Sequence, residues 1–272
     1  MSVNLCGWCG APLPVAAPRC PFCGAEPREG PARDVGPEPI SFAQPLWLDG
    51  QEELASRLAP RAAGARPVVV MDAVDDELAK MSAWLVAETI WMTTDLPATA
   101  VAFHQRGVVT SPPSMDFEWF APMIRKVGAP AAILWGRAPA DGEWHLRVPT
   151  DGSERSFWGS LAECSEAIAA WLVERGLARR IERPAWWTPL PGPAPAERAT
   201  AMWFLRQQIL AREHLVKLDA ASRSYFLDQT LSLAEKHPAE VHTLLARASL
   251  RCEEASGGVT ADWKSRAARL RP

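Results

Sequence analysis

Hydrophobic positions in the middle of the chain change repeatedly between continuous runs, helical spacing and alternation. Residues 66–71 (R-P-V-V-V-M) form a continuous apolar run, which is typical of a strand buried on both faces. A helix follows, because an apolar stripe with helical spacing runs through Leu78, Met81, Leu85 and Met92. Further strands are predicted at 99–104, 131–136, 143–149 and 155–158, with a short helix at 116–127. This alternation predicts an α/β unit with a mixed sheet and covering helices.

Local signals define the end of this unit. Asp-Gly dipeptides at 141–142 and 151–152 favour hairpin turns between the last strands. Ser160 and Glu163 form the capping box S-x-x-E, which opens a helix that Gly176 closes. The unit therefore ends in an amphipathic helix.

The rest of the chain has helical periodicity throughout. Helices are predicted over residues 196–218 and 220–236, a third begins at Pro238, and a last one holds Trp263. From His237 onward the pattern is similar to one tetratricopeptide-like helical hairpin, although a plain helical bundle accounts for it equally well. The C-terminal region is predicted to be all-α.

Two proline-rich segments suggest linkers between these regions. We predict a zinc ribbon at residues 1–27, a linker at 28–45, the α/β domain at 46–183, a second linker at 184–196 and a helical region at 197–272. The second linker contains Trp186 and Trp187, an unusual pair for a free linker. Either the two indoles pack on a neighbouring domain, or they form a binding patch for a protein partner.

Four cysteines near the N-terminus have the spacing of a metal site. Cys6 and Cys9 stand in C-x-x-C-G, and Cys20 and Cys23 stand in C-P-x-C-G. Two such knuckles can supply four thiolates to one tetrahedral zinc ion, whose binding would fold a segment too small for its own core. Two disulfides or a rubredoxin-type iron centre are the alternatives.

Charge and composition restrict the class of partner. The net charge of -3 gives no long-range attraction to nucleic acid or to an anionic membrane, so we expect protein partners. The N-terminus lacks the basic and apolar regions of a signal peptide, and we expect a cytoplasmic protein. The excess of arginine over lysine and the abundance of alanine and proline are typical of a GC-rich bacterial genome.

Two segments together give a resemblance to a known family. The chain resembles the TolB N-terminal-like α/β domain in the segments V-V-V-M-D-A-V-D-D-E-L and D-F-E-W-F-A-P-M-I-R-K-V-G-A-P-A-A-I-L-W-G-R. The strand E-W-H-L-R-V-P-T-D-G and the closing helix complete the resemblance. The resemblance covers about half of the chain. It implies a non-catalytic domain for protein contact or sensing.

The sequence carries no recognisable catalytic motif. It has no phosphate-binding loop, no G-x-G-x-x-G and no G-x-S-x-G, and His237 and His242 are five residues apart rather than four. We therefore predict a non-enzymatic, zinc-binding interaction or regulatory protein.

An enzyme is the alternative. Asp72, Asp75 and Asp76 follow the first buried strand, where they could coordinate a metal ion or a nucleotide, or could simply begin a helix favourably. His104 could join Asp116 or His145 if the sheet brings them together.

Overall fold

The computed structural model describes residues 38–58, 65–72, 81–105, 108–110, 129–137, 142–188, 195–213 and 215–270. The predicted zinc ribbon and the predicted short helix at 116–127 lie outside these residues.

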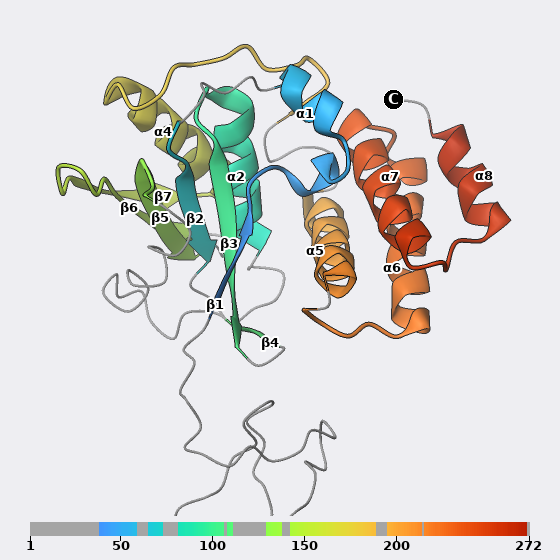
Figure 1. The fold of residues 1–272 in the computed structure, drawn as a ribbon. Coiled ribbons are helices and arrows are strands. Elements are labelled where there is room, and N and C mark those ends of the chain that lie inside the picture. Colours follow the sequence, from blue (N-terminus) through green and yellow to red (C-terminus); the bar gives the residue numbers. More distant parts are fainter. Residues whose placement is uncertain are drawn as a thin grey trace, which may run out of the picture.

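One mixed sheet forms the centre of the α/β part (Figure 1). Its strand order is β1-β3-β2-β5-β6-β7, and β4 pairs with β3. The central strand β2 is parallel to β3 and β5, whereas the other pairs are antiparallel. The mixed sheet predicted from the sequence is therefore present. The strands are β1 (Glu38–Phe42), β2 (Val68–Asp72), β3 (Ala98–Gln105), β4 (Val108–Thr110), β5 (Ala132–Arg137), β6 (Gly142–Arg147) and β7 (Glu154–Gly159).

Helices α2 (Ser82–Thr93) and α4 (Leu161–Glu174) cover one face of this sheet. Every residue of α2 is buried, as expected of a helix with packing partners on all sides. Helix α4 begins with the predicted capping box: the Ser160 side chain accepts from the backbone N–H of Glu163, and the Glu163 carboxylate accepts from the Ser160 backbone. This hydrogen bonding lowers the pKa of Glu163.

A tight contact between β5 and β6 requires glycine at position 136. Gly136 pairs with Trp144, whose indole is fully buried. A Cβ atom at position 136 would lie 2.5 Å from the Glu143 carbonyl oxygen and 2.5 Å from the Trp144 ring. The missing side chain therefore makes room for an indole in the core.

The predicted linker at 28–45 overlaps the first strand. Residues 38–42 form β1, which pairs with β3 at the edge of the sheet. Pro39 is tolerated there because an edge strand donates fewer ladder hydrogen bonds. The 3₁₀ helix η1 (Leu46–Leu48) and α1 (Glu52–Leu58) follow, and all three residues of η1 are buried.

The C-terminal region is helical, as predicted. Helices α5, α6 and α7 pack pairwise, and α8 lies on α6 and α7. In Figure 1, α5 lies beside α2 on the side opposite to α4. The four helices are α5 (Pro195–Arg212), α6 (Ala220–Lys236), α7 (Glu240–Ala255) and α8 (Ala261–Arg269).

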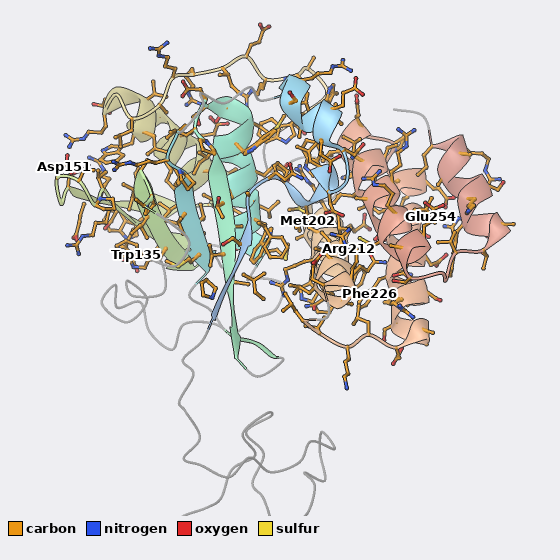
Figure 2. All side chains as sticks on the ribbon, in the orientation of Figure 1. Trp135, Asp151, Met202, Arg212, Phe226 and Glu254 are labelled. Carbon is orange, nitrogen blue, oxygen red and sulfur yellow. The ribbon has the colours of Figure 1, made fainter. Side chains whose placement is uncertain are left out.

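One hydrophobic core continues from the sheet into these helices. Trp84 and Ile90 of α2 belong to the same buried cluster as Met202 of α5 and Leu245 of α7. Figure 2 places Met202 and Arg212 between the sheet layer and the outer helices, far from Trp135 of β5 and from Asp151 in the turn between β6 and β7. The described α/β and helical parts therefore share their interior.

Candidate functional site

The predicted metal ligands are not among the described residues. Cys6, Cys9, Cys20 and Cys23 all lie in the N-terminal segment outside them. Among the residues that the structure does describe, no group of three or more His, Cys, Asp or Glu side chains is arranged to hold a metal ion.

The acidic strand end lies where parallel strands finish. Asp72 is the last residue of β2 and pairs with Gly136 of β5, while Asp75 and Asp76 fall outside the described residues. The carboxyl ends of parallel strands commonly border ligand sites. His104 and His145 are not neighbours, because β2 and β5 separate their strands β3 and β6.

The tryptophan pair lies at a seam between α2 and α5. Trp187 is 3% exposed, and its Nε1–H donates to Glu88 Oε1 over 2.8 Å. Trp186 is partly buried and packs edge-on against Trp47, with ring centroids 5.8 Å apart. A partner could reach Trp187 only after this segment had moved away from α2.

A buried ion pair completes this seam. The Arg198 guanidinium of α5 donates to the same Glu88 oxygen, and both side chains are almost fully buried. Arg198 also donates to the Thr188 carbonyl oxygen over 3.3 Å. Since a buried carboxylate needs a partner of opposite charge, Glu88 joins α2, the 184–188 segment and α5.

The face of the sheet opposite to α2 carries a row of polar and aromatic side chains, which belong to β5, β6 and β7. His145 stacks on Trp135, with centroids 5.6 Å apart, and its Nδ1 lies 2.9 Å from Ser156 Oγ. Its Nε2 lies 3.3 Å from Glu143 Oε1. We name Glu143, His145, Ser156 and the neighbouring Trp158 the sheet-face patch.

The order Ser156–His145–Glu143 is that of a nucleophile, a base and an orienting carboxylate. Catalysis would also require N–H donors aimed at an oxyanion. Ser156 lies on β7 and the other two side chains lie on β6, so the three form a polar network across this pair of strands.

Trp158 is the most exposed large hydrophobic side chain of the described residues, at 69%. It projects from β7, which has a single neighbour, β6, among the described strands. Sequence reasoning missed it. The sequence did contain a signal for it: side chains alternate between the two faces of a strand, and along residues 155–158 this alternation places the aromatic residue Trp158 toward solvent.

The remaining cysteines of the described residues are buried thiols. Burial raises the pKa of Cys252 to about 12, and it also raises the pKa of Cys164. Cys252 lies beside an ion pair in which Arg212 donates to Asp49 over 2.6 and 3.0 Å. These groups attach η1 to α5 and α7, and the raised pKa keeps the Cys252 thiol protonated near neutral pH.

Helices of the described residues are all too short or too polar to cross a membrane. Comparison of the chain with protein-family models, curated proteins and solved structures finds no match. The resemblance to the TolB N-terminal-like domain and to a tetratricopeptide hairpin therefore stays a prediction based on the order and spacing of elements.

Proposed function

We propose that this chain is a non-catalytic bacterial zinc-binding protein that acts in the cytoplasm as an interaction or regulatory scaffold. The observation that carries the proposal is Trp158, an indole that is 69% exposed on β7, the last strand of the sheet in the part of the chain that the structure describes. Tryptophan is enriched at the energetic centres of protein interfaces because it buries a large area at a small cost in side-chain entropy.

The position of Trp158 favours a partner that extends the sheet. A strand at a sheet edge can take up an extended segment through main-chain hydrogen bonds, while pockets for alternate side chains give specificity. Glu154 and Arg155 charge the start of β7, which discourages unspecific pairing, whereas Trp158 lies near its end. The sheet-face patch would supply polar contacts beside the indole.

The experiment is affinity purification of zinc-loaded protein from the native host, with Trp158→Ala as the test variant. We expect Trp158→Ala to lose the co-purifying protein while its melting temperature stays close to that of the wild type, because the side chain is exposed. Tyr225→Ala is the matched control, since Tyr225 is the other exposed large hydrophobic residue and lies in α6. Equal recovery with Trp158→Ala and wild type would contradict the role of Trp158.

A second candidate follows from the position of Asp72. This residue ends the central parallel strand, so a nucleotide- or metal-dependent enzyme would use Asp72, Asp75 and Asp76 at that edge. A thermal-shift screen with nucleotides and divalent ions separates the two proposals. Stabilisation that Asp72→Asn abolishes would favour the enzyme, and no stabilisation by any of them would favour the scaffold.

A further inference from the structure

The exposed indole of the sheet-face patch has a carboxylate as its direct neighbour. Trp158 of β7 lies opposite Glu143 of β6 in the antiparallel register. Side chains at such positions share one face of a sheet, with Cβ atoms about 4.5–5.5 Å apart. Phe157, the residue before Trp158, belongs to the core on the other face. The indole and the carboxylate therefore lie side by side on the face opposite to α2.

The Glu143 carboxylate is only partly used within the chain. Its Oε1 lies 3.3 Å from His145 Nε2, and the side chain is 35% exposed. In the part of the chain that the structure describes, its Oε2 has no hydrogen-bond partner and no arginine or lysine pairs with it. Glu154 on the same face differs, because Arg147 Nη1 lies 3.4 Å from its Oε1. Glu143 is therefore the carboxylate of this face that can still accept from a cation.

Other indoles of the chain carry an arginine on the ring face. The Cζ atom of Arg175 lies 5.6 Å from the ring centroid of Trp171. The same distance is 5.0 Å between Arg206 and Trp84. Among the described residues, no ring and no cation packs on Trp158 in this way. The ring face of the most exposed indole is thus open to a cation from another molecule.

We propose that Trp158 and Glu143 together bind an arginine side chain of the extended partner segment. This inference rests on the proposed function, since it names the side chain that the partner presents to the indole. A planar guanidinium can stack on the indole while its N–H groups donate to Glu143 Oε2. A lysine ammonium would satisfy the charge but has no flat surface for stacking. Charge and shape together favour arginine.

Selection from a displayed library of random heptapeptides on the zinc-loaded full chain tests the proposal. We expect the enriched peptides to contain arginine and to lose binding with Trp158→Ala. Replacing that arginine by citrulline keeps the shape of the side chain and removes its charge. The Kd of the peptide should then rise by about tenfold or more.

The variant Glu143→Gln isolates the carboxylate charge on the protein side. Glutamine keeps the size of the side chain and an acceptor oxygen toward His145. The Kd of the arginine peptide should rise by about tenfold, while that of the citrulline peptide stays close to its wild-type value. Glu154→Gln is the matched control, because this carboxylate on the same face is already paired with Arg147. It should leave both Kd values unchanged.

Charge reversal gives a test that misfolding cannot imitate. Selection on Glu143→Lys should return peptides with aspartate or glutamate in place of the arginine. A selection that still returns arginine overturns the proposal. Arg137 of β5 also lies opposite Glu143 in the register, and Arg137→Ala should leave the Kd of the arginine peptide unchanged. A tenfold tighter Kd in that variant would mean that Glu143 has its cation within the chain, and would overturn the proposal.

Two further outcomes separate this inference from the proposed function. Peptides that need Trp158 but bind equally well with citrulline, or equally well to Glu143→Gln, overturn the arginine assignment and leave Trp158 as an interaction residue. A library that returns no peptide dependent on Trp158 overturns the arginine assignment and also contradicts the role of Trp158 in the proposed function.

Discussion

Trp187 and Glu88 are 99 positions apart in the sequence, yet the indole N–H of one donates to a carboxylate oxygen of the other over 2.8 Å. Arg198 donates to the same oxygen. A carboxylate in the middle of a buried helix is thus neutralised by one later segment, through Arg198, and hydrogen-bonded by another, through Trp187. The stability of the α2–α5 seam depends on this three-residue contact.

Removal of one charge from this seam should be costly. Glu88→Ala leaves the Arg198 guanidinium buried and uncompensated, and we expect a loss of about 3–5 kcal/mol in the free energy of unfolding. The measurement is urea unfolding followed by tryptophan fluorescence. Arg175→Ala, which breaks an exposed ion pair with Asp151, is the control and should cost less than about 1 kcal/mol.

Removal of both charges together should restore much of the loss. The double variant Glu88→Leu with Arg198→Met leaves no buried charge without a partner, so it should be more stable than Glu88→Ala. If Glu88→Ala lowers the free energy of unfolding by no more than Arg175→Ala does, the buried ion pair stabilises the fold no more than an exposed one, and the prediction is wrong.

The buried carboxyl of Glu253 should make stability depend on pH. Glu253 is 3% exposed and accepts from Gln208 Nε2 over 3.0 Å, and burial raises its pKa above 4.5. Between pH 4.5 and the raised pKa, Glu253 binds more protons in the folded state than in the unfolded state. The stability contributed by Glu253 is therefore complete below pH 4.5 and is lost as the pH rises through the folded pKa.

A comparison with Glu253→Gln isolates this contribution. The amide keeps an acceptor for Gln208 but does not ionise, so the variant should gain stability relative to the wild type as the pH rises from about 4 to 7. Thermal melts at a series of pH values measure the difference. A constant difference across that range would show that Glu253 does not titrate abnormally.

A methyl group at position 136 should disturb the β5–β6 pair. Gly136→Ala places a Cβ 2.5 Å from the Glu143 carbonyl oxygen and the Trp144 ring, and overpacking of this kind costs about 1–3 kcal/mol. Gly152→Ala is the control: its φ of +70° disfavours alanine, but its Cβ would meet no atom within 4 Å. Urea unfolding should rank Gly136→Ala as the more destabilised variant.

The predicted ribbon should contain metal. Four thiolates in two knuckles fit zinc, and purified protein should hold about one zinc ion per chain by elemental analysis. Cys9→Ser should lose the metal while the melt of the remaining protein stays cooperative. Iron in place of zinc, or no metal after reducing purification, would contradict the prediction.

Much of the sheet could be predicted because its signals are local. The apolar run at 66–71 became β2, and the capping box at Ser160 opened α4. Strand β1 was missed because Pro39 and its neighbours give a linker-like composition, and only pairing with β3 shows that the segment belongs to the sheet.

The contacts of the seam could not be predicted, because they depend on how distant segments pack. The sequence did contain one signal: Glu88 is the single charged residue of α2, and a lone carboxylate in a helix buried on all sides needs a cationic partner. That this cationic partner is Arg198, 110 positions away, follows only from the fold.

The shared core also determines which pieces of the gene could be exchanged or expressed separately. A fragment that stopped before residue 184 would lack Trp187 and Met202, and would expose α2 to water along the side that α5 covers. Such a fragment should aggregate or require a solubilising fusion. The smallest unit that evolution could transplant intact therefore runs from β1 to the C-terminal helices, across the proline-rich segment that looks like a natural place to cut.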